Sequence, residues 1–275
     1  MTSRTLINGA PIDVVPALDR GLAYGDGLFE SIRFVGAVAP LWSRHMQRLV
    51  ESCERLRIPA VDVVQLWREG LEVSRDLPQS VLRITVTRGI GERGYAPPLS
   101  PQPTRIVTAF APPFVNDEVY SRGVRVRMCD IRLAEQPLLA GMKHLNRLEQ
   151  VLARAEWNDP AIAEGVLCDI HDRVISATMA NLFALVDGVL LTPAVDRCGV
   201  AGVARAEVLA TCPQAQVGTL TLDALLEASE VFLSSSVRGI LPVHSLGERV
   251  YAPGAMTRQL QQHWHNLGFS MEQGG

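Results

Sequence analysis

The sequence predicts an α+β fold built in two blocks. The first block mixes strand-like apolar runs with two stretches whose apolar residues repeat at helical spacing. A segment with proline and polar residues, 111–117, has the composition of a connector. The second block has short strand-like runs, turns and further helical stretches. Mixed strands and helices on both sides of a connector indicate two parts with a ligand cleft between them.

The elements of the first block follow from its residue patterns. Apolar runs of four to nine residues bounded by turn residues predict strands, and longer stretches with a helical repeat predict helices. The predicted strands are 5–8, 27–35, 81–87 and 105–109, and the predicted helices are 43–56 and 61–74.

The second block begins with a predicted strand at 123–127. A small-residue turn, Ala140-Gly141, then precedes a stretch with apolar residues at helical spacing. These residues are Leu145, Leu148, Val151, Leu152 and Ala155. Turns are predicted at 169–172 and 187–188, and helices at 203–209 and 254–266.

A segment of the first block matches the G-x-G-x-x-G pattern at Gly89, Gly91 and Gly94, directly after the predicted strand 81–87. A dinucleotide-binding turn requires a helix to begin there. The chain continues instead with Tyr-Ala-Pro-Pro at 95–98, which does not support a helix. The segment is therefore not predicted to bind a dinucleotide.

The composition predicts a cytoplasmic enzyme. The 275 residues have a mass of 30.0 kDa, 47% are hydrophobic and the net charge is −3, so the chain can bury a substantial core. No apolar run approaches the ~20 residues that span a bilayer, and the N-terminus lacks the apolar core of a signal peptide. We expect neither a membrane nor a nucleic acid as partner, because the chain has no basic cluster.

The cysteine pattern argues against a disulfide framework or a metal site. The number of cysteines is odd, their spacing is wide, and no CxxC pair occurs. We predict reduced, mostly buried thiols at Cys53, Cys129, Cys168, Cys198 and Cys212.

Lys143 is the only lysine, and the remaining 25 of the 26 basic residues are arginine. Only a lysine amine can lose its proton near neutral pH and attack a carbonyl. Lys143 is therefore the candidate Schiff-base residue, with a chance surface lysine as the alternative. We expect it at the start of the following helix, where the helix dipole would favour the free amine. His144 or Asn146 is predicted to cap this helix, and Glu149 to pair with an arginine or stay solvated.

Seven segments spread over nearly the whole chain form a pattern that is specific in combination and in order. The segment with Lys143 is KHLNRLEQVLARAE. The other segments are LINGAPIDVVPALDRGLAYGDGLFESIR at 6–33, SRHMQRL at 43–49, TRGIGERGYAP at 87–97, SATMANLF at 176–183, LTPAVDRCGVAGVAR at 191–205 and EVFLSSSVRGILPV at 230–243. Together they resemble the fold-type IV pyridoxal-phosphate enzymes, and most closely the 4-amino-4-deoxychorismate lyases among them. Branched-chain and D-amino-acid aminotransferases share the fold and several of these motifs.

The resemblance implies a two-domain enzyme. A smaller N-terminal α/β domain would occupy 1–113, and a larger β-rich domain that binds pyridoxal 5′-phosphate would occupy 118–275, with a linker near 111–117. It also implies a homodimer in which N-terminal segments help to close the partner's site.

The resemblance also assigns the cofactor site, with Lys143 as the attachment residue. Arg48 matches the phosphate-binding arginine, with a solvated charge on the helix 43–56 as the alternative. Gly202-Val203-Ala204 matches a backbone anion site at a helix start, which needs no charged side chain. Ser236 matches a hydroxyl that reaches the same phosphate, although a serine run is more often a turn. Asn181 is the asparagine of the motif that ends in Asn-Leu-Phe.

The same resemblance suggests substrate-binding residues. Tyr24 resembles a family residue near the substrate carboxylate. The alternative for Tyr24, and also for Phe29, is that the side chain is a buried aromatic with a packing role only. Arg88 and Arg93 lie in the segment that would cover the substrate, where arginines bind carboxylates through paired hydrogen bonds. Their alternative is a solvated surface charge.

The chain departs from the family pattern at Ser176. The pattern has a glutamate five residues before the asparagine, which pairs with the cofactor's pyridine nitrogen, and here that position is Ser176. A hydroxyl makes a neutral hydrogen bond, roughly half as strong as a charge-assisted one, and favours an unprotonated ring. Transamination relies on a cofactor ring that withdraws electrons strongly. An elimination in which the substrate ring becomes aromatic depends less on this property of the cofactor. Ser176 therefore favours a lyase over an aminotransferase.

These observations predict a lyase that converts 4-amino-4-deoxychorismate to p-aminobenzoate and pyruvate in folate biosynthesis. The alternatives are a branched-chain or D-amino-acid aminotransferase of the same fold, and a catalytically weakened protein that binds pyridoxal phosphate.

Overall fold

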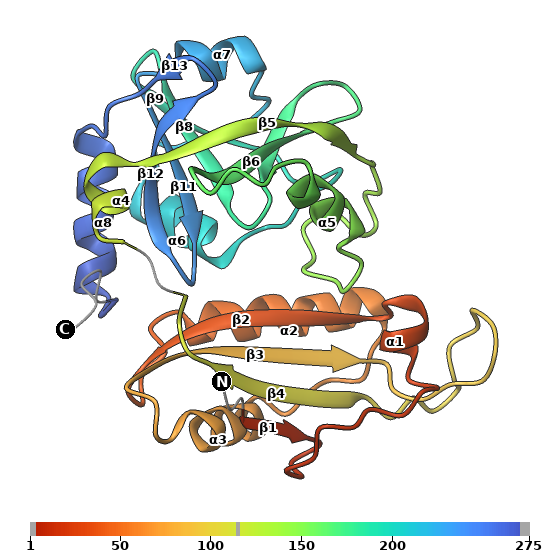
Figure 1. Cartoon of the computed structure of the whole chain (residues 1–275). Helices are drawn as coiled ribbons and strands as arrows, with labels where there is room; N and C mark the ends of the chain where they lie inside the picture. The colour runs from red at the N-terminus through yellow and green to blue at the C-terminus, as the bar shows by residue number, and fades with distance from the viewer. Residues whose placement is uncertain (1–3, 114–115, 270–275) are drawn as a thin grey trace. The chain divides into compact units, whose positions relative to one another are not determined.

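The computed structural model describes residues 4–113 and 116–269 and divides into two compact units (Figure 1). The first comprises 1–113 together with 142–146, and the second comprises 114–141 together with 147–275. The boundary falls within the segment predicted as a connector, of which residues 114 and 115 lie outside the described residues. The segment 142–146 carries Lys143 and belongs to the first unit, whereas the sequence places it in the C-terminal domain.

The first unit is built on a four-stranded antiparallel sheet of order β1-β4-β3-β2. Strand β2 pairs with β3 along its full length. The strands are β1 (Arg4–Ile7), β2 (Gly27–Val35), β3 (Gln79–Thr87) and β4 (Thr104–Phe110), which confirms the four predicted strands.

Helices cover one face of this sheet. The ring of Phe34 in β2 lies 6.2 Å from the ring of Trp42 and 5.5 Å from that of Trp67, so both longer helices pack on its face. Because successive side chains of a strand point to opposite faces, Glu30 shares the face of Phe34 and Phe29 points to the other. The helices are α1 (Arg20–Tyr24), α2 (Trp42–Leu56) and α3 (Val63–Ser74), and the last two confirm the predicted helices.

The second unit is built on a nine-stranded mixed sheet of order β10-β9-β8-β11-β12-β5-β6-β7, with β13 paired to β12. The pairs β10–β9, β12–β5 and β5–β6 are parallel, and the other pairs are antiparallel. The strands are β5 (Val124–Leu133), β6 (Ile162–Asp169), β7 (Val174–Ala177), β8 (Asn181–Val186), β9 (Val189–Pro193), β10 (Gln216–Gly218), β11 (Glu230–Ser235), β12 (Gly239–Leu246) and β13 (Arg249–Val250).

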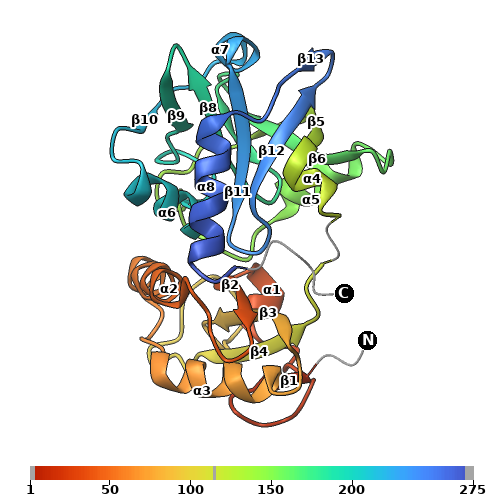
Figure 2. The ribbon, with the colours of Figure 1, turned by 90° about the vertical axis from the view of Figure 1, so that its left-hand side faces the viewer.

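Helices α6 and α8 pack against strand β11, and Figure 2 shows α8 running along β11 and β12. The rings of Phe183 in β8 and Phe232 in β11 stack 5.0 Å apart across neighbouring strands. The helices of this unit are α4 (Glu118–Arg122), α5 (Leu148–Ala155), α6 (Val203–Thr211), α7 (Leu222–Glu227) and α8 (Ala255–Asn266). The predicted helices 203–209 and 254–266 are thereby confirmed.

Both predicted turns of the second block are present. Asp187 and Gly188 join β8 to β9 with φ angles of 49° and 78°, as a two-residue hairpin of the type with positive φ at both positions requires. Asp172 lies between β6 and β7 with a φ of 58°. Short polar side chains tolerate this left-handed conformation better than most others.

The segment with Gly89, Gly91 and Gly94 continues as a loop in which the described backbone forms no helix. Gly89 has a φ of 87°, and a Cβ atom there would lie 1.8 Å from the carbonyl oxygen of Gln102. The glycine is required by this close approach of two backbones. The expectation that no helix begins after this segment is confirmed.

The helix predicted after Lys143 begins later than expected. Helix α5 begins at Leu148, and its N-cap is Arg147. The prediction of His144 or Asn146 as the cap is therefore wrong, and the Asn146 amide instead donates to the Gly25 carbonyl (3.1 Å). The Glu149 carboxylate accepts from the Ala134 amide (2.8 Å).

In residues 4–113 and 116–269, no helix combines the length and the apolar character needed to cross a bilayer. The same residues contain no cluster of histidine, cysteine and acidic side chains suited to a metal ion. All five cysteines are buried, as predicted. Burial raises the pKa of the Cys53 thiol to about 11 and that of Cys129 to about 12, so these thiols are unreactive at neutral pH.

Candidate active site

Lys143 is held by β2 and not by a helix. The Phe29 amide donates to the Lys143 carbonyl (3.0 Å), and the Leu145 amide donates to the Gly27 carbonyl (3.0 Å). The segment therefore lies extended along β2, and α5 begins only at Leu148. The expected position of Lys143 at the start of this helix is wrong, because the helix begins only at Leu148.

The Lys143 side chain lies over the ring of Phe29. Its Nζ is 4.4 Å from the ring centroid, and the guanidinium carbon of Arg83 is 4.2 Å from the same centroid. Arg83 is exposed and pairs with Ser31, so it shares the sheet face of Phe29. Two cations beside one ring suit an anionic ligand. Sequence reasoning missed Arg83, although strand alternation was a usable signal.

Arg48 is held by a buried carboxylate. Its Nε donates to Glu30 Oε1 (2.8 Å), and its Nη2 donates to Glu30 Oε2. His45 Nδ1 lies 2.6 Å from the same Oε2, and Glu30 and His45 are each 1% exposed. Arg48 is therefore an ordered charge, and the alternative of a solvated charge on the face of α2 does not hold.

Burial and neighbouring charges set the ionisation of this cluster. Burial alone would raise the pKa of Glu30, but the charge of Arg48 and the hydrogen bond from His45 lower it to about 2. Burial lowers the pKa of His45; Glu30 opposes this shift, and the charges of Arg48 and Lys143 add to it. At neutral pH Glu30 is ionised and His45 is neutral, so the Nδ1–H group of His45 donates to Glu30.

The buried Glu30 carboxylate is expected to make stability sensitive to acid. Its pKa is about 2 in the folded protein and 4.5 in an ordinary glutamate, so between these values the unfolded chain binds more protons. The free energy of unfolding therefore falls as the pH falls from about 4.5 toward about 2. Glu30→Gln should reduce this fall by on the order of 3 kcal/mol. Urea unfolding at several pH values measures it, and equal pH dependence in both proteins would contradict an ionised Glu30.

Tyr24 contacts the loop that follows β3. Its hydroxyl accepts from the Gly94 amide (3.1 Å), and its ring lies 5.4 Å from that of Tyr95. The Arg20 guanidinium donates to the carbonyls of Gly94 and Tyr95 (3.0 Å each). This side of the loop is thus fixed to α1, while Arg93 next to it is exposed. Tyr24 of α1 thus contacts the loop that carries Arg93.

Arg88 is buried in structural contacts. Its Nε and Nη2 donate to Asp26 (2.7 and 2.9 Å), and its Nη1 and Nη2 donate to the carbonyls of Arg57 and Leu56 (2.9 Å each). Burial would raise the pKa of Asp26, but hydrogen bonds from Arg88 and Arg20 outweigh it and lower the pKa. The predicted contact of Arg88 with a substrate carboxylate is not supported, because its donors already hold the end of α2 and the Asp26 loop.

In the second unit, helix α6 begins beside Asn181. Gly202 is its N-cap and has no side chain to cap the first turn, which includes Val203 and Ala204. A Cβ atom on Gly202 would lie 2.0 Å from Asn181 Oδ1, and Asn181 Nδ2 donates to the Val200 carbonyl (2.9 Å). Free amides at a helix start suit an anion such as phosphate. The structure thus brings three of the predicted cofactor residues together.

A hydroxyl that the sequence reasoning missed lies on the same sheet face as Asn181. Ser234 is directly opposite Asn181 in the β8–β11 register, so the two side chains are neighbours. The Ser234 hydroxyl is buried and has no hydrogen-bond partner among the described residues. The predicted Ser236 is half-buried in the turn between β11 and β12. The serine run was a signal for both, but it could not distinguish them.

Ser176 is buried in β7, directly opposite Leu167 of β6. The sequence from 174 to 186 contains no carboxylate. Glu164 of β6 is a buried carboxylate in the same sheet, but it accepts hydrogen bonds from Thr178 and Arg238. The folded chain therefore also has a serine, and not a carboxylate, at the position of the family's glutamate.

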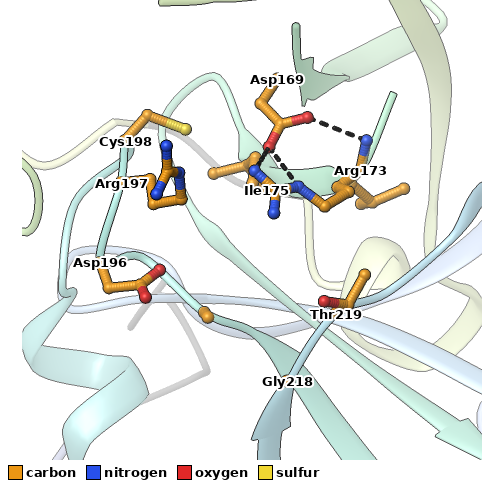
Figure 3. A pocket seen from close by; sticks show the side chains of 10 residues that line it. Asp169, Arg173, Ile175, Asp196, Arg197, Cys198, Gly218 and Thr219 are labelled. Atoms are coloured by element: carbon orange, nitrogen blue, oxygen red, sulfur yellow. Dashed lines mark hydrogen bonds and ion pairs between the residues drawn. The ribbon is translucent and has the colours of Figure 1, made fainter. Parts of the chain in front are cut away.

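A small pocket in the second unit is lined by charged side chains (Figure 3). Arg173 Nε donates to Asp169 Oδ2 (2.7 Å). Burial would raise the pKa of Asp169, but hydrogen bonds from Arg173 and from the His171 amide lower it. The cavity volume is about 30 Å³, which is room for about two water molecules. None of the predicted site residues lines this pocket, and it is too small for a cofactor.

Comparison with known proteins identifies the family. The family model "Amino-transferase class IV" matches residues 27–246. The chain is 37% identical to an aminodeoxychorismate lyase of Vibrio harveyi over 267 residues, which cover 93% of this chain and 97% of that protein.

Solved structures agree with this assignment. The structure of 4-amino-4-deoxychorismate lyase from Pseudomonas aeruginosa superposes with a TM-score of 0.91 at 45% identity and covers 95% of this chain and 98% of that chain. A branched-chain amino acid aminotransferase from Escherichia coli superposes with a TM-score of 0.83 at 22% identity, covers 99% of this chain and 96% of that one, and shows the fold alone. With its family model matched from the start of β2 to the end of β12, the chain belongs to the class IV aminotransferase family.

Proposed function

We propose that the protein is a pyridoxal 5′-phosphate-dependent lyase that converts 4-amino-4-deoxychorismate to p-aminobenzoate and pyruvate. The observation that carries the proposal is the placement of the only lysine, Lys143, over Phe29 and beside Arg83. This constellation occurs in a chain that is 45% identical to the Pseudomonas aeruginosa lyase.

The chemistry of the donor groups fits this cofactor. Its aldehyde requires an amine, which Lys143 supplies. Its phosphate requires an anion site, for which we assign Arg48, the first turn of α6 with Val203 and Ala204, and the Ser236 hydroxyl. The close approach of Asn181 to Gly202, which leaves no room for a Cβ atom, supports a backbone cradle at this helix start.

The bound cofactor supplies an electron-withdrawing ring that stabilises negative charge on the substrate carbon that bears the amine. The free Lys143 amine would remove the proton from that carbon. Lys143 next donates a proton to the departing enolpyruvate oxygen. Loss of enolpyruvate from the adjacent carbon makes the six-membered ring aromatic, and this drives the step.

The substrate carries two carboxylates, and we assign arginines to them. Arg83 shares the face of Phe29 with the lysine, and Arg93 is exposed on the loop fixed by Arg20. Guanidinium groups bind carboxylates through paired hydrogen bonds. Tyr24 is assigned to position this loop through its contact with Gly94.

Ser176 is assigned to the cofactor's ring nitrogen. A neutral hydrogen bond there leaves the ring less strongly electron-withdrawing than a carboxylate would. The proposed elimination tolerates this because aromatisation contributes to the driving force, whereas transamination does not have such a contribution. Ser176 therefore supports the lyase over the aminotransferase within the same family.

Ser176 variants should separate the two reactions. Ser176→Ala should slow p-aminobenzoate formation by about tenfold or less, because one neutral hydrogen bond is lost. Ser176→Glu should raise transamination of alanine or branched-chain substrates by keeping the ring protonated. Product ratios are compared with the wild type at equal cofactor occupancy. Fast transamination by the wild type that does not rise in the glutamate variant would show that Ser176 does not select the reaction.

One assay tests the proposed function as a whole. Purified protein with bound cofactor is incubated with 4-amino-4-deoxychorismate, and p-aminobenzoate and pyruvate are measured in equal amounts. Conversion of the cofactor to its amine form by an amino acid, without p-aminobenzoate, would instead support an aminotransferase. Retention of the cofactor without turnover of either substrate would support a weakened cofactor-binding protein.

We further propose a homodimer in the cytoplasm. The apolar residues whose spacing predicts α5 are exposed in the single chain: Leu148 to 75%, Val151 to 59% and Leu152 to 58%. An exposed apolar face on a helix is typical of an interface with another subunit. Sedimentation in solution tests this proposal, and a monomer at micromolar concentration would contradict it.

A further inference from the structure

We propose that Glu30 and His45 are positioning residues that fix the guanidinium of Arg48 for the cofactor phosphate. This inference rests on the proposed function, in which Arg48 binds the phosphate. Glu30 of β2 and His45 of α2 form a buried cluster with Arg48.

The geometry constrains the arginine strongly. Glu30 accepts from both Nε and Nη2 of Arg48, and a carboxylate that engages two donors of the planar guanidinium sets its plane as well as its position. His45 in turn holds Glu30, with Nδ1 at 2.6 Å from Oε2. Strand β2 and helix α2 thus share one chain of contacts that ends at Arg48.

The arrangement is poorly suited to stability alone. A buried ion pair contributes little compared with apolar packing in the same space. His45 adds a second cost, because its Nε2 is buried and lacks a hydrogen-bond partner among the described residues. An apolar side chain at position 45 would avoid both costs. We infer that the cluster is there to orient Arg48 and to balance its charge before an anion binds.

The cluster also balances the charge of Arg48. The ionised Glu30 offsets this charge. A neutral His45 supplies a donor to Glu30 without adding a further positive charge.

Comparison of two cofactor forms tests the inference. Full-length protein freed of cofactor is titrated with pyridoxal 5′-phosphate and with pyridoxal, which lacks the phosphate, and binding is followed by absorbance. Glu30→Gln should weaken binding of the phosphate form by about tenfold, the scale of one hydrogen bond to a charged group. Binding of pyridoxal should stay within about twofold of the wild type, because no phosphate contact is lost.

Variants at position 45 separate positioning from simple packing. His45→Asn retains a donor near the place of Nδ1 and should keep most of the affinity for the phosphate form. His45→Phe retains the ring but removes the donor, and should behave like Glu30→Gln. Thermal unfolding of each variant shows whether enough folded protein is present for the titration.

The outcomes are distinguishable. Equal loss of both cofactor forms in Glu30→Gln, or no loss of the phosphate form, would overturn the role of Glu30. Wild-type affinity in His45→Phe would remove His45 from the proposal. If the wild type binds neither form, the proposed function itself fails, and Glu30 and His45 lose the role argued for them.

Discussion

Lys143→Ala is expected to abolish attachment of the cofactor and to lower lyase activity by at least about 10³-fold, the scale of a lost acid-base group. No other lysine exists in the chain to replace it. The substitution should leave the fold intact, because the segment is tied to β2 through the carbonyl of residue 143 and the amide of Leu145. Borohydride reduction followed by mass measurement of the intact protein detects the attached cofactor.

Lys143→Arg is the matched control for this variant. An arginine retains the positive charge over the ring of Phe29 but cannot form the covalent link. If charge alone mattered, Lys143→Arg would keep activity while Lys143→Ala would lose it. A cofactor adduct on the alanine variant would contradict the central assignment.

Arg48→Ala is expected to have the second largest effect, and on two properties at once. Loss of the guanidinium removes the proposed phosphate contact and leaves Glu30 as a buried carboxylate without its main partner. Breaking a buried ion pair in this way costs about 3–5 kcal/mol of stability. We therefore expect the variant to lose its cofactor on dialysis and to unfold at lower urea concentration than the wild type.

The double variant Glu30→Gln with Arg48→Ala separates these two effects. Removing both charges should recover much of the stability, because no uncompensated carboxylate remains buried. Cofactor retention should stay low, because the phosphate contact is still missing. Recovery of cofactor binding in the double variant would show that Arg48 acts only through the fold.

Arg93→Ala is the second control. Arg93 is exposed on the loop held by Arg20 and is assigned to a substrate carboxylate. We expect a higher KM with unchanged cofactor retention. Equal loss of cofactor in Arg48→Ala and Arg93→Ala would remove the distinction between the two sites.

The sequence by itself determined the features that depend on local patterns. The strand 27–35 and the helices near 43–56 and 203–209 could be predicted because alternation, helical repeats and glycine turns act between residues that are close in the chain. Two single residues could also be identified from the sequence alone. Lys143 stands out because all other basic residues are arginine, and Ser176 stands out because the family motif has a glutamate there. The order of the motifs was sufficient to indicate the family.

The tertiary structure decided which residues meet across the chain. Helical spacing predicted α5 but could not show whether its apolar face is buried, because a core and a subunit interface use the same residues. Arg83 and Arg88 look alike in sequence, yet one lies exposed beside Phe29 and the other is buried against Asp26. Lys143 lies against β2 through backbone pairing with a strand far away in sequence. Such pairings depend on packing of the whole unit, which no local pattern records.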